Sequence, residues 1–271
     1  MAIDTHCHLD ASEFDADREL VIQSAVLAGV RCIVIPAVEV ANFEAVRQLA
    51  HRLPHGAYAL GIHPLFVPQA GEQDLDWLVQ ALERNRDDPK LVAVGEIGLD
   101  LFEPHLKDPP FLDKQIRIFK AQLSIAKMFQ LPVILHVRRA QDLVLKYLRL
   151  AGLSGGIAHA FNGSFQQAQQ FIDLGFALGM GGALTFTRAS QIRRLATEIP
   201  LENLVLETDS PDIAPAWVQP DCITAQRRNT PVHLLRIAQT IADLRQCDIK
   251  TVIDTTTQTT HRVLPRLRST D

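Results

Sequence analysis

Two histidines, His6 and His8, stand near the start of the chain with a single residue between them. On an extended segment, side chains two positions apart point to the same side, so both imidazoles can face one site while Cys7 faces the other way. Imidazoles combined with carboxylates are typical ligands of cations such as Zn²⁺ and Mn²⁺. The pair alone is a weak signal, because short metal motifs also match by chance.

Further ligand-type residues follow, each at or just beyond the end of a short apolar run. Taken singly, a histidine in such a place is more often a surface or hydrogen-bonded residue than a ligand. The candidate metal ligands are His6, His8, Glu96, His136, His159 and Asp209. They are too many for one four-coordinate ion, which predicts two divalent cations that share a bridging ligand at about 3.5–4 Å separation. The set leaves Zn²⁺, Mn²⁺ and Mg²⁺ open as the native metal.

The apolar runs that precede these residues indicate a parallel sheet. They are rich in Val, Ile and Leu, as strands buried on both faces are, and segments with helical spacing separate them. The expected strands cover residues 2–4, 30–36, 57–62, 91–97, 132–137, 156–160, 177–181 and 204–207. This alternation predicts an α/β fold, a single (β/α)8 TIM-type barrel that forms one domain over residues 1–271. In such barrels the active site lies at the carboxyl ends of the strands, where the candidate ligands would meet.

The bulk composition limits the possible partners. The chain of 271 residues is 47% hydrophobic and 21% charged, which is ordinary for a globular protein. Its net charge of −4 excludes a generic binder of polyanions, so a nucleic acid would have to be held by local cations or metal. The cysteines Cys7, Cys32, Cys222 and Cys247 form no C-x-x-C pair, which favours reduced thiols. Without a signal-peptide pattern or an apolar run long enough to cross a bilayer, we expect a cytoplasmic protein with no membrane association and no obligate protein partner.

Several segments resemble the TatD family of metal-dependent hydrolases, the TatD-type deoxyribonucleases among the amidohydrolase-like barrels. The matching segments are DTHCHLD at 4–10, GIHP at 61–64, VGEIGLD at 94–100, PVILH at 132–136, GIAHAFNG at 156–163 and LETDSP at 206–211. The resemblance implies one cation held by His6, His8, Glu96 and Asp209, and a second held by Glu96, His136 and His159. The chain departs from the family pattern at Val137, Asn162 and Thr230, which leaves the ligands intact and the substrate preference open.

Hydrolysis of a phosphodiester in DNA, or of a small phosphodiester, is the reaction that these residues and the resemblance favour. Bound cations lower the pKa of water to about 7, and we expect Asp209 to act as general base beside the bridging Glu96. His63 would orient the substrate or stabilise the leaving oxygen. Phosphate contacts are expected from Arg138, Arg188 and Arg228, for which the alternative is a solvated surface charge. Arg139 is a further candidate for a phosphate contact, but for it the surface-charge alternative weighs more than for Arg188.

Other interpretations of the sequence remain open. The same centre can attack an ester or amide carbonyl, as in amidohydrolase-like enzymes or in D-aminoacyl-tRNA deacylation. A degenerate barrel that only binds a partner would lack ligands, yet every ligand position is filled. Histidinol-phosphatase-like phosphoesterases also begin with H-x-H but do not account for the segments at 95–100 and 206–211. Trp217, in an expected loop at 211–231, would either stack on a base or anchor that loop.

Overall fold

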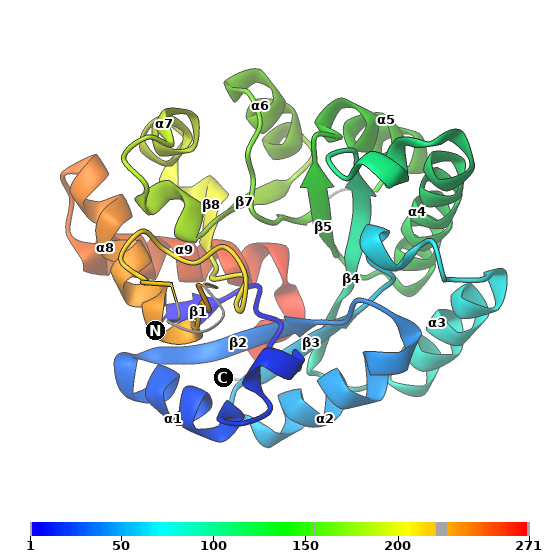
Figure 1. The fold of residues 1–271 in the computed structure, drawn as a ribbon, viewed down its shortest axis with the longest axis horizontal. Helices are drawn as coiled ribbons and strands as arrows, with labels where there is room; N and C mark the ends of the chain where they lie inside the picture. Colours follow the sequence, from blue (N-terminus) through cyan, green and yellow to red (C-terminus); the bar gives the residue numbers. More distant parts are fainter. Residues whose placement is uncertain (1, 154, 221–226, 270–271) are drawn as a thin grey trace.

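Eight parallel strands lie in chain order around a barrel with helices outside it (Figure 1). The computed structural model describes residues 2–153, 155–220 and 227–269. The strands are β1 (Ala2–Asp4), β2 (Val30–Pro36), β3 (Gly56–Leu60), β4 (Leu91–Asp100), β5 (Val133–Arg138), β6 (Gly156–Ala158), β7 (Phe176–Met180) and β8 (Leu204–Leu206). Each pairs in parallel with the next, so the predicted α/β barrel is confirmed.

The barrel closes where the chain leaves β1 and β8. Thr5 N donates to Leu206 O at 3.0 Å, and Asp209 N donates to His6 O at 2.8 Å. These hydrogen bonds join the first and last strands of the sheet although some 200 residues separate them in the chain. They also fix the segment after β8 beside the two amino-terminal histidines.

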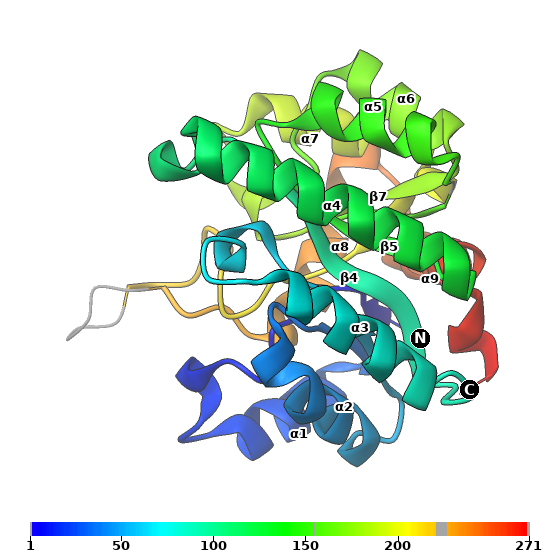
Figure 2. The same cartoon turned by 90° about the vertical axis from the view of Figure 1, so that its right-hand side faces the viewer.

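Helices cover the outside of the sheet. They are α1 (Arg18–Ala28), α2 (Phe43–Arg52), α3 (Glu72–Arg84), α4 (Pro109–Phe129), α5 (Gln141–Ala151), α6 (Phe165–Asp173), α7 (Ser190–Glu198), α8 (Leu234–Arg245) and α9 (Ile249–Val263). Helices α3 and α4 lie side by side outside β4 (Figure 2). Among the described residues, no helix combines the length and the apolar character needed to span a bilayer.

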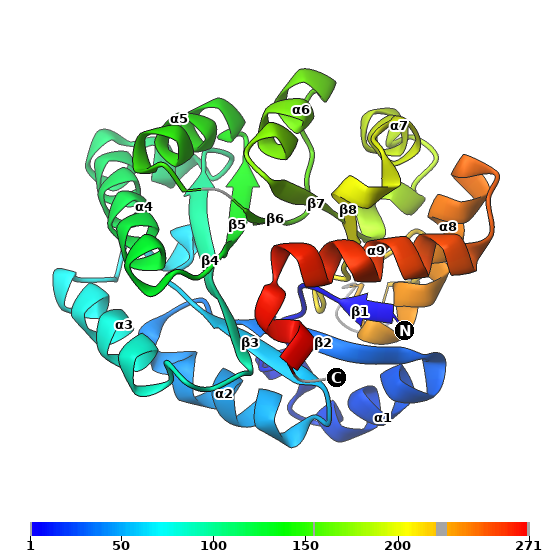
Figure 3. The same cartoon turned by 180° about the vertical axis from the view of Figure 1, so that it is seen from behind.

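Helix α9, which the sequence pattern does not separate from α8, crosses one end of the barrel (Figure 3). The residues at and after its end, Val263, Leu264 and Leu267, join an apolar cluster with Ile3 and Val34 from the first two strands. Because α9 contacts β1, β7 and β8, it covers the amino-terminal ends of the strands. The site is therefore built at the opposite end.

The carboxyl end of strand β4 lies furthest from its expected position. It continues three residues beyond the predicted end at Ile97 and finishes at Asp100. Its pairing with β5 shifts register between Val94 and Ile97, so Glu96 lies at an irregularity within the strand rather than at its end. Part of the expected loop at 211–231, including Cys222, lies outside the described residues.

Candidate metal centre

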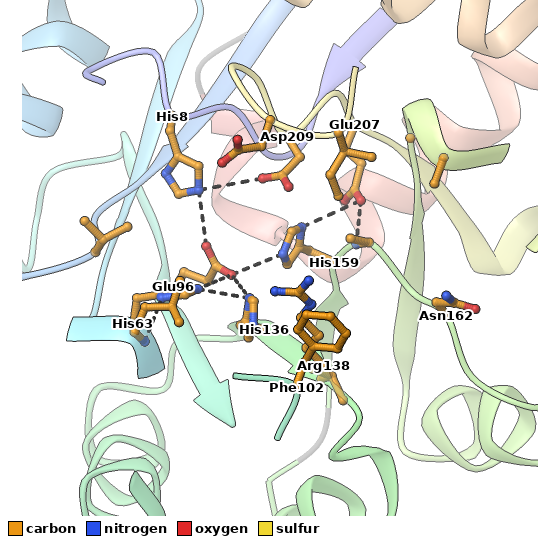
Figure 4. A pocket seen from close by; sticks show the side chains of 18 of the residues that line it. His8, His63, Glu96, Phe102, His136, Arg138, His159, Asn162, Glu207 and Asp209 are labelled. Atoms are coloured by element: carbon orange, nitrogen blue, oxygen red, sulfur yellow. Dashed lines mark hydrogen bonds and ion pairs between the residues drawn. The ribbon is translucent and has the colours of Figure 1, made fainter. Parts of the chain in front are cut away.

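The six candidate ligands converge at the carboxyl ends of the strands. Figure 4 labels all of them except His6 and shows Glu96 between the histidines. Glu96 Oε2 lies 3.0 Å from His6 Nε2 and 3.4 Å from His8 Nε2. Glu96 Oε1 lies 2.9 Å from His136 Nδ1 and 3.1 Å from His159 Nε2. Each carboxylate oxygen therefore faces its own pair of imidazole nitrogens, which is the arrangement that a bridging ligand requires.

The spacing of these atoms fits the coordination of divalent cations. His6 Nε2 and His8 Nε2 are 3.2 Å apart, and Asp209 Oδ1 lies 3.6 Å and 3.7 Å from them. Nitrogen ligands at typical Zn–N distances on a tetrahedron are separated by about 3.3 Å. Glu96 Oε2 is buried without a hydrogen-bond partner among the described residues, a costly state that a cation would relieve.

His63 stands beside the same carboxylate, but its hydrogen bonds indicate a different role. Its Nδ1 accepts a hydrogen bond from Leu65 N at 3.1 Å, so in the neutral ring the proton is on Nε2. That Nε2 lies 3.3 Å from Glu96 Oε1 and 3.0 Å from His136 Nδ1. Burial lowers the pKa of His63 to about 4, which keeps the ring neutral. Although His63, Glu96 and His136 are close enough to hold an ion, this tautomer makes His63 a donor rather than a ligand.

Two carboxylates that the sequence analysis did not assign support the histidines from behind. Asp100 Oδ2 lies 3.1 Å from His136 Nε2, which turns the Nδ1 of that ring toward Glu96. Glu207 is buried, and its Oε1 lies 3.7 Å from His159 Nδ1. The sequence signal that could have identified them is their spacing: Asp100 lies four residues after Glu96, and Glu207 lies two residues before Asp209. Carboxylates of this kind orient metal-binding histidines and raise their basicity.

Asp209 is held by a polar network after β8. Its backbone has φ 58°, a left-handed conformation that is uncommon outside glycine. The neighbouring Thr208 donates its backbone N and its hydroxyl to the two oxygens of buried Asp4, at 2.9 Å and 2.6 Å. Asn229 Nδ2 donates to Thr208 O at 2.7 Å. Asp4 and Asn229 therefore position Asp209, a role that the sequence analysis did not assign to them.

The electrostatics of the centre are those of a carboxylate among imidazoles. Burial raises the pKa of Glu96, but the surrounding histidines outweigh it and hold that pKa well below its usual range. Burial alone would lower the pKa of His8, yet its closeness to the negative charge of Glu96 raises it to about 9. Burial raises the pKa of Asp209 to about 6, although His159 and His8 oppose the shift. The raised pKa values mean that His8 and Asp209 hold protons more tightly in the absence of a cation, so metal binding would release them.

The three predicted phosphate-binding arginines lie in different places. Arg138 lines a cavity of about 1330 Å³ above the centre. Arg228 is bound through both terminal nitrogens to Asp17, at 2.8 Å and 2.6 Å, and does not belong to the cavity lining. Arg188, also outside that lining, lies over the ring of Phe186 at 5.7 Å. The structure thus brings only Arg138 of the three to the cavity.

Trp217 packs as part of the loop after β8. Its Nε1 donates to His233 Nδ1 at 3.2 Å, and the guanidinium of Arg236 lies 4.1 Å from the centre of its ring. Stacking of Trp217 on a base is disfavoured, because its indole N–H and its ring already have protein partners. The loop-anchor interpretation fits these contacts.

Comparisons with known proteins match the whole barrel. Residues 3–265 match the family model described as TatD related DNase. The chain is 41% identical over 245 residues to an uncharacterized metal-dependent hydrolase, YjjV, of Escherichia coli (strain K12), covering 90% of each. It is 34% identical over 242 residues to the 3'-5' ssDNA/RNA exonuclease TatD of Salmonella typhimurium, covering 88% of this chain and 89% of that protein. The crystal structure of the E. coli TatD homolog YjjV aligns with a TM-score of 0.87 at 39% identity, covering 97% of this chain and 98% of that one.

Proposed function

This chain belongs to the TatD-related DNase family of metal-dependent hydrolases, and we propose that it hydrolyses phosphodiester bonds of DNA at a centre of two divalent cations. The cations would be held by His6, His8, Glu96 and Asp209 on one side and by Glu96, His136 and His159 on the other, as the distances from the two oxygens of Glu96 support. The observation that carries this proposal is the position of Glu96, whose two oxygens face separate pairs of nitrogens.

The cations, when bound, would supply Lewis-acid activation of water and stabilise the negative charge that develops on the phosphate. Asp209 is the proposed proton acceptor, because its carboxylate lies beside the imidazoles of His6 and His8 and would adjoin a water bound by the cation that they hold. His63 presents its Nε2 proton toward the centre and would donate it in a hydrogen bond to an oxygen of the substrate. Asp100, 3.1 Å from His136 Nε2, would keep that ring oriented, and Glu207, 3.7 Å from His159 Nδ1, would attract the ring of His159.

Single-stranded DNA is the substrate to test first. A relative with 34% identity is named as an exonuclease of single-stranded DNA and RNA. The cavity is wide enough for a nucleotide, and Arg138 supplies a cation in its wall although the chain has a net charge of −4. Zn²⁺, Mn²⁺ and Mg²⁺ all accept ligand sets of nitrogen and oxygen, so each belongs in the test.

Metal removal and substrate comparison together test the proposal. We expect a chelator to abolish hydrolysis of a single-stranded DNA oligonucleotide and of bis(p-nitrophenyl) phosphate, and at least one of the three cations to restore it. A D-aminoacyl ester serves as the third substrate. Full phosphodiesterase activity after verified metal removal, or cleavage of the ester alone, would overturn the proposal.

The role of Asp209 is tested by the isosteric substitution Asp209→Asn. Loss of a general base lowers turnover by about 10²–10⁴-fold, and we expect kcat to fall far more than substrate affinity. Metal content must be measured in parallel, because Asp209 is also a proposed ligand. An unchanged kcat in a fully metal-loaded variant would remove the base role.

A further inference from the structure

Two arginines share one aromatic ring at the wall of the cavity. Arg138 ends β5 and Arg139 follows it, while Phe102 lies just beyond β4. The guanidinium carbons lie 3.7 Å and 4.7 Å from the centre of the Phe102 ring, and all three residues line the cavity (Figure 4 labels Phe102 and Arg138). The exposed ring therefore holds two positive charges together although they repel each other.

This cluster lies next to the candidate metal centre. Asp100 Oδ2 is 3.1 Å from His136 Nε2 and 3.8 Å from Arg138 Nη1. A single carboxylate thus separates the guanidinium from a candidate ligand. Glu103 lies 3.3 Å from the same Nη1 and balances part of the charge of Arg138.

Arg139 carries the charge that is less balanced. Within residues 2–153, 155–220 and 227–269, the guanidinium of Arg139 lies over the Phe102 ring, and no carboxylate lies at ion-pair distance from it. Its backbone has φ 55°, a left-handed conformation that an arginine rarely adopts. Such backbone outliers occur preferentially at functional sites, where the surrounding structure imposes them. Arg139 is exposed, so its N–H groups can reach a ligand in the cavity.

The rest of the described cavity wall offers no other lysine or arginine to a second anion. Glu13, Glu39 and Asp212 line the side formed by the loops after β1, β2 and β8, and their charges repel phosphate. On the side of β5 and β6, Gln141 Nε2 already donates to Asn162 O at 2.9 Å. Among the described residues of the lining, Arg138 and Arg139 are the two that carry a permanent positive charge. A guanidinium offers a planar fork of N–H donors that matches phosphate oxygens.

We propose that Phe102, Arg138 and Arg139 form a subsite for a second phosphate of the substrate, one nucleotide away from the phosphate that is hydrolysed. The inference rests on the proposed function, since the first phosphate lies at the metal centre. Phe102 is a positioning residue that fixes the two guanidinium groups. The subsite selects substrates with at least two phosphates, such as a nucleotide chain, over isolated phosphodiesters.

Calorimetric binding to the metal-reconstituted protein tests the subsite without relying on turnover. We expect a nucleoside 3′,5′-bisphosphate to bind about tenfold or more tightly than the corresponding 5′-monophosphate, as one additional charged hydrogen-bonding contact allows. Arg139→Gln and Phe102→Leu should each reduce that preference to about twofold. Arg86→Gln and Phe129→Leu are matched controls, because Arg86 lies over Phe129 at 5.4 Å near the amino-terminal ends of β4 and β5. Both controls should keep the preference.

Kinetics separate this inference from the proposed function. For a dinucleoside monophosphate carrying one extra terminal phosphate, KM should rise about tenfold in Arg139→Gln and Phe102→Leu while kcat is unchanged. The ratio of the KM values for the substrates without and with the extra phosphate should fall about tenfold in these variants and stay at the wild-type value in Arg86→Gln and Phe129→Leu. Absence of any phosphodiester hydrolysis would refute the proposed function. The preference for the bisphosphate over the monophosphate could still be measured by calorimetry and would still test the subsite. A wild type without preference for the bisphosphate, or variants that retain it, would overturn the subsite.

Discussion

Replacing Gly179 by alanine is expected to disturb the candidate metal centre through Glu207. A β-carbon at Gly179 would lie 2.1 Å from Glu207 Oε2 and 2.5 Å from its carboxyl carbon, far inside contact distance. Because Gly179 does not adopt a left-handed backbone, alanine fits the local conformation and the clash is the whole perturbation. The carboxylate must shift by about 1 Å in an interior that is closely packed.

The shift has two consequences whose sizes follow from known cases. Glu207 Oε1 accepts a hydrogen bond from Ala160 N at 2.5 Å and lies 3.7 Å from His159 Nδ1, so both contacts change. Overpacking of this kind lowers the free energy of unfolding by about 1–3 kcal/mol. Loss of a carboxylate that orients a metal-binding histidine reduces metal affinity by about 10–100-fold. We expect both effects in Gly179→Ala.

Titration calorimetry of the metal-free protein with Zn²⁺ or Mn²⁺, together with chemical denaturation, measures these changes. Gly71→Ala is the matched control, because a β-carbon there would meet its nearest atom at 3.9 Å, and its metal affinity should equal that of the wild type. In a Glu207→Ala background, Gly179→Ala should have no further effect on metal affinity. Wild-type affinity in Gly179→Ala, or an undiminished effect in the Glu207→Ala background, would refute the reasoning.

Further substitutions separate catalysis, metal binding and stability. His63→Ala should lower kcat by about 10²–10³-fold, because the variant lacks one hydrogen-bond donor to the charge that develops on the substrate. The variant should still bind two cations, and loss of a cation would identify His63 as a ligand. Asp88→Asn, remote from the centre, should lower the free energy of unfolding at pH 7 by about 1–3 kcal/mol with kcat unchanged, since Asp88 accepts hydrogen bonds from Tyr58 and Lys90. Burial raises the pKa of Asp88, but hydrogen bonds with His51, Lys90 and Tyr58 outweigh it and lower that pKa in the folded protein. The stabilisation is therefore present above about pH 4, the pKa of an unfolded aspartate, and is lost as the pH falls through the lower folded-state pKa. A stability difference between wild type and Asp88→Asn that persists unchanged in acid would contradict that assignment.

The strand order and the candidate ligands were readable in the sequence because both follow from local patterns. Apolar runs on consecutive positions indicate buried parallel strands, and the strand ends then place His136 and His159 at one rim. The spacing of His6 and His8 similarly predicted that their rings converge. That Glu96 joins the two sides was implied by the resemblance to the TatD family rather than by the strand pattern, because Glu96 lies at an irregularity within β4.

Long-range pairings were not readable in this way. Arg228 binds Asp17, 211 residues earlier, and no local pattern distinguishes that arginine from one that faces substrate. Helix α9 packs under the barrel rather than around it, which depends on the finished shape of the sheet. Phe102 acquires its two guanidinium partners only because β4 extends beyond its predicted end and lies beside β5.

Anomalous diffraction from crystals of the Zn²⁺-loaded protein, recorded at the zinc absorption edge, tests the bridged centre most directly. We expect two peaks per chain, each about 2.0–2.2 Å from a different oxygen of Glu96. One should be surrounded by the nitrogens of His6 and His8, the other by those of His136 and His159. A single peak, or two peaks of which only one contacts Glu96, would contradict the account.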